Sequence, residues 1–109
     1  MTEVTLASNI TTATSGPTAG VQPYGSTQPI VIDIFGKAVG TSGAQNIIFT
    51  VQESADNSSW TTAATITLAG TFTSKPFAAQ VKISKALVRV TVGTITGTGA
   101  ALYADARIP

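Results

Sequence analysis

The carboxylates are the first residues to consider for chemistry, because the sequence contains no histidine and no cysteine. Its acids are Glu3, Asp33, Glu53, Asp56 and Asp105. A glycosidase needs two carboxyl groups that face each other across a cleft, and no spacing in this chain brings two together. We expect Asp56 to cap a polar turn, and the other acids to lie at strand ends, to pair with basic side chains or to face solvent. The sequence therefore predicts no catalytic carboxylate pair.

Other catalytic arrangements also lack a partner. A serine nucleophile needs a base, and without histidine only lysine could serve. A calcium site at Asp56 and Asn57 would begin with one carboxylate, which is a poor start for this cation. The turn Gly97-Thr98-Gly99 is expected between two strands, so it does not resemble a phosphate-binding loop before a helix. We predict that the protein is not an enzyme and holds no cofactor or metal.

The composition excludes further classes. Charged residues make up 10% of the 109 residues, with a net charge of +1, whereas typical domains have about 25%. Nucleic-acid binding needs clustered lysine and arginine, and a membrane span needs about 20 consecutive apolar residues. Neither is present, and residues 1–16 lack the basic and apolar regions of a signal peptide. A surface rich in threonine but poor in charge is typical of a chain that packs against copies of itself.

The clearest structural pattern is a hairpin at residues 46–68. Before the turn, Ile47, Phe49 and Val51 alternate with residues of the opposite face. After it, Ala64, Ile66 and Leu68 do the same. Between the two runs, residues 53–59 are short and mostly polar, which favours a turn. Trp60 follows the turn, where we expect it to cover one end of the domain.

Further segments show the same period of two, which indicates strands with one buried face. They are residues 29–40, 77–83, 86–95 and 100–108. Their inward positions are predicted to be aliphatic: Ile30, Ile32, Ile34, Val81, Ile83, Val88, Val90, Val92, Leu102, Ala104 and Ala106. Roughly six to eight short strands separated by turns indicate a sandwich or barrel. We predict an all-β, antiparallel β-sandwich of jelly-roll or immunoglobulin-like type at residues 29–109.

Residues 1–28 differ in composition from the rest, and two interpretations are open. They form a loop-rich lead-in with one or two edge strands, or an extended N-terminal arm that pairs with a neighbouring subunit. The second interpretation makes its apolar residues contacts to a partner. With the loops at 40–45, 70–76 and 95–99, the interface candidates are Val4, Leu6, Ile10, Val21, Tyr24, Phe72 and Tyr103.

Six short stretches carry a resemblance to a known family. They are residues 40–43 (GTSG), 48–60 (IFTVQESADNSSW), 65–67 (TIT), 69–71 (AGT), 86–90 (ALVRV) and 97–99 (GTG). Together with the spacing between them, over about residues 38–105, they resemble small β-sandwich proteins of tailed bacteriophage particles. Asn57 stands where glycine is usual in that pattern, and Ala86-Leu87 stands in place of an aromatic residue.

The resemblance implies a non-enzymatic virion structural protein. Such proteins often decorate the outside of the phage head, where they act as cement between major capsid protein subunits. A homotrimer would fit the local three-fold positions of the shell, and the protein would be made in the host cytoplasm. The alternative is a receptor- or carbohydrate-binding β-sandwich module of a phage tail or surface protein. That module would need an exposed aromatic cleft, which Trp60, the tyrosines and the phenylalanines would have to supply.

Overall fold

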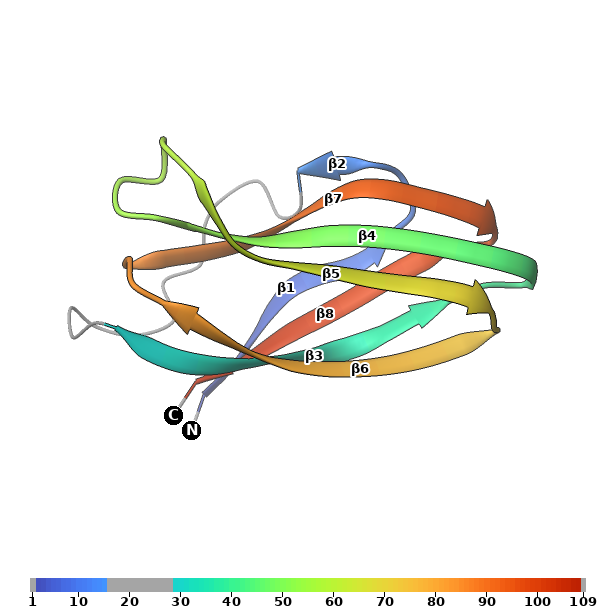
Figure 1. The fold of residues 1–109 in the computed structure, drawn as a ribbon, viewed down its shortest axis with the longest axis horizontal. Helices are drawn as coiled ribbons and strands as arrows, with labels where there is room; N and C mark the ends of the chain where they lie inside the picture. Colours follow the sequence, from blue (N-terminus) through green and yellow to red (C-terminus); the bar gives the residue numbers. More distant parts are fainter. Residues whose placement is uncertain (1, 16–28, 109) are drawn as a thin grey trace.

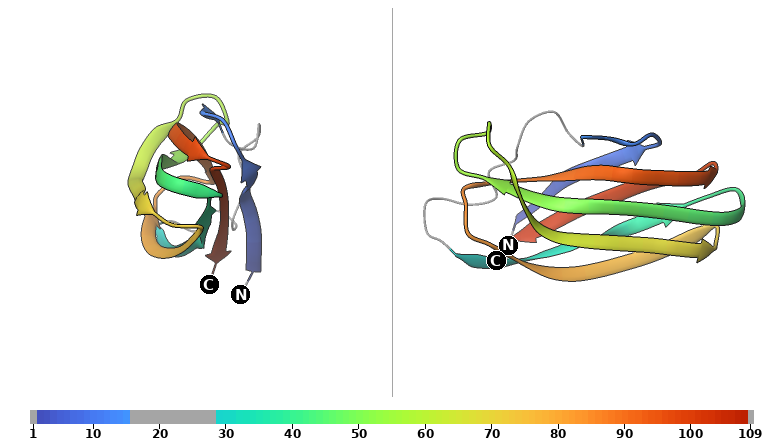
Figure 2. Two further views of the ribbon diagram at one scale, coloured as in Figure 1. Left: turned by 90° about the vertical axis from the view of Figure 1, so that its right-hand side faces the viewer. Right: turned by 45° about the horizontal axis from the view of Figure 1, so that its top comes forward.

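The computed structural model describes residues 2–15 and 29–108, and every regular element within them is a β-strand. The first sheet has the order β1-β8-β3-β6, and the second has the order β2-β7-β4-β5, with two-residue β2 at its edge. The two sheets pack face to face (Figures 1 and 2). The strands are β1 (Thr2–Ile10), β2 (Thr14–Ser15), β3 (Ile30–Val39), β4 (Ser42–Ser54), β5 (Thr61–Thr71), β6 (Ser74–Ile83), β7 (Leu87–Thr98) and β8 (Ala101–Ile108).

The pairing scheme decides between the two predicted sandwich types. β1 pairs with β8, β2 with β7, β3 with β6 and β4 with β5, all antiparallel. The chain therefore behaves as one long hairpin whose tip is the β4–β5 turn. Two further antiparallel pairs, β3–β8 and β4–β7, form when this long hairpin curls on itself. Its strands are then divided between the two sheets. This strand order is that of a jelly roll.

The core lies between the sheets and follows the period-two prediction. Phe49 of β4 is fully buried, and its ring centroid lies 5.3 Å from that of Phe77 of β6, so this pair joins the two sheets. Around it, the fully buried large aliphatic side chains come from both sheets: Leu6, Ile32, Ile34, Ile47, Val51, Ile83, Val88, Val90 and Leu102. The predicted β-sandwich is confirmed, and no disulfide contributes to it because the sequence has no cysteine.

The N-terminal strand belongs to the sandwich. β1 runs along β8 of its own chain, and Leu6 and Ala7 are buried in the common core. Thr2–Ile10 is therefore an edge strand of the first sheet. The sequence pattern understated this strand because two register shifts, at Thr5/Ala7 and Ala7/Ile10, interrupt its alternation. Residues 16–28 lie outside the described part.

Replacing Phe49 with alanine should destabilise the fold strongly, because a fully buried aromatic ring would leave a cavity between the sheets. We expect a loss of about 3–5 kcal/mol in the free energy of unfolding, measured by urea denaturation. Val31→Ala is the control, since Val31 of β3 is 49% exposed and its truncation should change that free energy by no more than about 0.5 kcal/mol. Equal losses in the two variants would contradict the position of the core.

Candidate functional site

The outer face of the second sheet is dominated by threonine, and we call it the threonine face. Its residues are Asn46, Ile48, Thr50 and Gln52 of β4, Thr65, Thr67 and Ala69 of β5, and Arg89, Thr91, Thr94 and Thr96 of β7. The register places these side chains in rows across the three strands. One row is Thr65–Thr50–Thr91, and the next is Thr67–Ile48–Thr94. Directly opposite residues in a sheet point to the same side, so these rows form one continuous surface.

The threonine face carries a single charged side chain, and that charge already has partners. The Nε of Arg89 donates to Oε1 of Gln52 at 2.9 Å, and its guanidinium lies 4.2 Å from the centroid of the Trp60 ring. Thr91 Oγ1 donates to the same Gln52 oxygen at 2.8 Å. The guanidinium is thus held beside Gln52 and Trp60. The other residues of the threonine face carry no charge.

A neutral surface of β-branched side chains suits docking over a broad area. Threonine is stiff about χ1, so little side-chain entropy is lost on contact. Its methyl group gains from burial, while its hydroxyl can donate and accept hydrogen bonds. A charged side chain that becomes buried on binding needs a partner of opposite charge. Apart from Arg89, the residues of this face are uncharged and need no such partner. The arrangement can therefore bind another surface of low charge.

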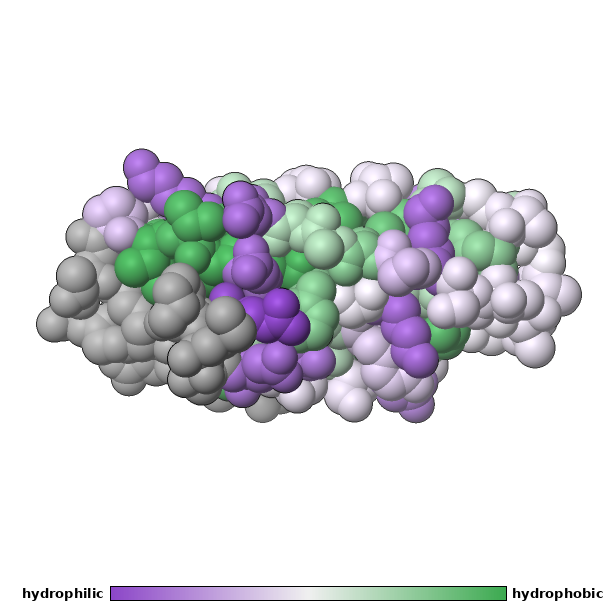
Figure 3. All heavy atoms as spheres, turned by 90° about the horizontal axis from the view of Figure 1, so that it is seen from below, coloured by the Kyte–Doolittle hydropathy of each residue, from purple (hydrophilic) through white to green (hydrophobic). Residues whose placement is uncertain are grey.

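The first sheet has the opposite character. Most of the charged residues lie in its strands: Glu3, Asp33, Lys37, Lys75, Lys82, Asp105 and Arg107. Seen from the side of β6, strongly hydrophilic residues cross the surface in bands, with an apolar patch toward one end (Figure 3). The two outer faces of the sandwich therefore differ sharply in charge, and each could meet a different environment.

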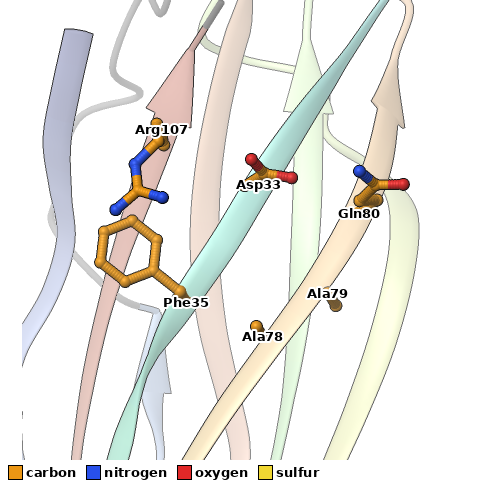
Figure 4. Close-up of a pocket in the computed structure, with 6 residues that line it drawn as sticks. All are labelled: Asp33, Phe35, Ala78, Ala79, Gln80 and Arg107. Carbon is orange, nitrogen blue, oxygen red and sulfur yellow. The ribbon is translucent and has the colours of Figure 1, made fainter. Parts of the chain in front are cut away.

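A shallow hollow of about 370 Å³ opens on the outer face of the first sheet. Asp33 of β3 and Gln80 of β6 stand opposite each other across it, with Ala78 as part of its floor. Arg107 of β8 lies over the Phe35 ring, with its guanidinium carbon 4.5 Å from the ring centroid (Figure 4). Its Nη2 also forms an ion pair with Glu3 Oε1 at 3.2 Å. These contacts turn Arg107 away from Asp33, so the hollow presents a carboxylate and an amide over an apolar floor.

Four of the aromatic rings that a sugar platform would need each have a basic side chain over one side of the ring. Besides Phe35 and Trp60, Tyr103 lies under the Lys37 ammonium at 5.6 Å and Phe72 under the Lys75 ammonium at 5.9 Å. Each cation–π contact of this kind stabilises by about 0.5–1 kcal/mol at an exposed site. A platform that stacks a sugar ring needs a free aromatic face, and here a cation lies over each of these rings.

The loops predicted as interface candidates meet at one end of the sandwich, where β4 begins and β7 ends (Figure 1). Gly40 N donates to Thr73 O at 3.0 Å, and Thr41 N donates to Thr98 O at 2.8 Å. Gln45, which is 2% exposed, adds bonds from its Nε2 to Ser42 O and Thr98 O. These hydrogen bonds thus connect the three loop segments, 40–45, 70–76 and 95–99, at one end of the molecule.

The individual interface candidates do not share one surface. Val4 and Ile10 of β1 and Phe72 are half-buried and pack against the core, and Leu6 is fully buried within it. The side chain of Leu6 is therefore not accessible to a partner. Tyr103 lies on the outer face of the first sheet, where its hydroxyl donates to Asn9 Oδ1 at 3.2 Å. Val21 and Tyr24 lie outside the described residues.

The tip of the β4–β5 hairpin is organised by Asp56, as the sequence predicts. Its Oδ1 accepts hydrogen bonds from the backbone N–H groups of Ser58 and Ser59, each at 2.9 Å, and from the Ser54 hydroxyl at 3.0 Å. These bonds to Ser59, Ser58 and Ser54 lower the pKa of Asp56 below its ordinary value of 3.8. Asn57 follows with φ of 62°, a left-handed conformation that asparagine tolerates and glycine adopts freely.

Comparison of the chain with protein-family models, with curated proteins and with solved structures gave no match. Within residues 2–15 and 29–108, no group of three or more acidic, histidine or cysteine residues is placed to hold a metal ion. That same part of the chain contains no helix long and apolar enough to cross a membrane. The assignment of function therefore depends on the surfaces described above.

The threonine face was not located by sequence reasoning, although a signal for it exists. Threonine recurs two residues apart at 65 and 67 and again at 94 and 96, on the faces opposite the aliphatic residues. The composition pointed to such a surface without placing it, because the rows become visible only when the register of three strands is known.

The carboxyl group of Asp56 should titrate below the range of an ordinary aspartate. Its charged form is favoured in the folded state, so its contribution to stability is present above the unfolded pKa and lost as pH falls through the folded pKa. An NMR titration of the carboxyl carbon measures the pKa directly. The stability difference between the wild type and Asp56→Asn should shrink over that same acidic interval. A titration at or above 3.8 would rule out the capping role.

Proposed function

We propose that this protein is a non-enzymatic structural component of a phage virion. It decorates the outside of the head and stabilises the shell by bridging neighbouring major capsid protein subunits, with the threonine face as its main docking surface. The observation that carries the proposal is the neutrality of this face, where one charged residue, Arg89, is bound by its own chain.

In the proposed mechanism, each copy holds neighbouring capsid subunits together by non-covalent contacts. A specific contact needs roughly 1,000 Å² or more of buried area, which a flat face of three strands can help to supply. If the protein binds the assembled shell better than free capsid subunits, mass action stabilises the assembled state. No bond is made or broken, so the protein needs only a rigid frame and a complementary surface, which the sandwich and the threonine rows provide.

Two further observations support a virion role. The hairpin at residues 48–60 and the strand at 86–90 resemble small β-sandwich proteins of tailed phages. The jelly-roll order is also used by viral capsid domains, although it serves lectins as well, so this support is an analogy at the level of the fold. On the assembled shell, copies at the three-fold positions would form a trimer by analogy, and this trimer of bound copies remains part of the proposal.

Placing a charge on the threonine face should weaken attachment to the shell. In Thr94→Lys, an ammonium group on β7 would be buried without an acidic partner. We expect binding to assembled heads of the phage that encodes the protein to weaken at least about tenfold, which corresponds to 1.4 kcal/mol. Co-sedimentation of the purified variant with heads stripped of this protein measures the effect.

Thr5→Lys is the matched control, since Thr5 is exposed on β1 of the first sheet. The same chemical change there should leave binding to the shell unchanged. If Thr5→Lys weakens attachment and Thr94→Lys does not, the docking surface is on the other sheet. If the wild type sediments with free subunits as readily as with heads, the bridging role is wrong.

A second candidate function is glycan binding in the hollow of the first sheet. Asp33 and Gln80 present a carboxylate and an amide without side-chain partners among the described residues, and such groups accept and donate hydrogen bonds to sugar hydroxyls. The cations over Phe35, Trp60, Phe72 and Tyr103 weigh against stacking, so binding here would depend mainly on polar contacts. This arrangement would suit a receptor-binding module of a tail or surface protein.

Asp33→Asn tests the second candidate, because it keeps the shape of the side chain and removes the charge that strengthens a hydroxyl hydrogen bond. Calorimetric titration with galactose, glucose and N-acetylglucosamine should show affinity that falls about tenfold or more in this variant. Asp105→Asn, on β8 of the same sheet but outside the hollow, should bind as the wild type does. The absence of heat with every sugar would remove glycan binding in the hollow.

A further inference from the structure

Strand β5 forms an unguarded edge of the second sheet. It is 11 residues long, and within the described part of the chain it pairs with β4 alone. In an antiparallel ladder, the backbone N–H and C=O groups of every second residue point away from the partner strand. Such an edge is a template for another strand unless charge, proline or distortion protects it. β5 contains no charged residue and no proline.

The other described edges carry the protection that β5 lacks. β6, at the corresponding edge of the first sheet, contains Lys75, Pro76 and Lys82. β1 contains Glu3 and two register shifts. β7 contains Arg89 and is partly covered by β2. The contrast is informative because natural sheets guard their edges by such devices, and here one long edge is left without them.

One end of β5 is unsuitable for pairing, and this narrows the open segment. Its register against β4 shifts between Val51 and Gln52, opposite Ala63, and the Lys85 ammonium donates to Thr61 Oγ1 at 3.2 Å. The distortion and the cation both lie near the beginning of the strand. Residues 64–69 beyond them keep a regular register with β4 and precede Gly70, whose φ is 134°, so their outer edge can accept a second strand.

We propose that residues 65–69 of β5 pair antiparallel with the same residues of a second copy of this chain. Around a two-fold axis, this segment of threonine, isoleucine, leucine and alanine lies beside its own copy, so no like charges come together. We place the two-fold axis at Thr67, so that Thr67 stands opposite Thr67 of the other copy and Thr65 opposite Ala69. These residues all lie on the outer side, so the outer face continues from one copy to the other. Ile66 and Leu68 extend the inner side in the same way.

The pairing has a consequence for the threonine face. It joins the two second sheets into one, in the order β2-β7-β4-β5-β5-β4-β7-β2, and places the two threonine faces side by side. Figure 2 shows β5 and β6 side by side at one side of the sandwich, so the partner approaches there. The inference does not depend on the proposed function, since the edge is open whatever the face binds.

The experiment measures the mass of the purified chain by light scattering from low micromolar to high micromolar concentration. The wild type should move toward the mass of two chains as concentration rises. In Thr67→Lys, two ammonium groups face each other across the axis, so the mass should stay that of one chain. Thr67→Glu should behave likewise, and an equimolar mixture of these two variants should recover the dimer, because opposite charges then meet.

Thr94→Lys serves as the control, since it changes the same face on β7 and leaves the β5 edge intact; its mass should follow the wild type. Hydrogen exchange should show outer amides of residues 65–69 becoming at least tenfold better protected in the dimer. A wild type that remains a monomer throughout overturns the inference, as does a dimer or trimer that persists in both Thr67 variants. Binding to heads is a separate measurement, so failure of one proposal is distinguishable from failure of the other.

Discussion

Antiparallel pairing of the first half of the chain with the second half is the constraint on which the rest of the structure depends. β4 sits at the centre of this scheme, because it pairs with β5 through the hairpin and with β7 through the rolled ladder. Once those registers are set, the period of two decides the side of every side chain. A slip of one residue in β4 would move Phe49 from the core to the outer face and expose the contact with Phe77.

The same constraint separates the two outer faces chemically. Residues that cannot be buried must point outward, and in the second sheet these are mainly threonine, whereas in the first sheet they include most of the charges. The cations are held largely by aromatic rings: Lys37, Lys75, Arg89 and Arg107 each lie over one. One ion pair, between Arg107 and Glu3, is present among the described residues. Four of the six basic side chains thus lie over aromatic rings of other segments of the chain, and Arg89 is the one charged residue of the threonine face.

Local pattern predicted much of this fold. The alternation at residues 47–51 and 64–68 gave the central hairpin, and the polar run before Trp60 gave a turn capped by Asp56, as the hydrogen bonds confirm. The strand order could not be predicted, because pairing of β1 with β8 joins residues about a hundred positions apart and nothing in either segment encodes the partner. For the same reason the rows of the threonine face, which need three registers at once, were not located. The strand at residues 2–10 was also hard to recognise, because a bulged edge strand has an irregular pattern.

The threonine face and the β5 edge of the second sheet would select their partners in different ways. A neutral face gains affinity from area and shape, so it recognises a large flat partner and its binding changes little with salt. An open edge gains affinity from backbone hydrogen bonds that any strand could satisfy, so it needs a partner that fits by symmetry. A second copy fits best, because the segment is its own complement and brings no opposing charge. Pairing at the edge would then enlarge the face without adding a charged residue, and the edge and the face would serve one assembled surface.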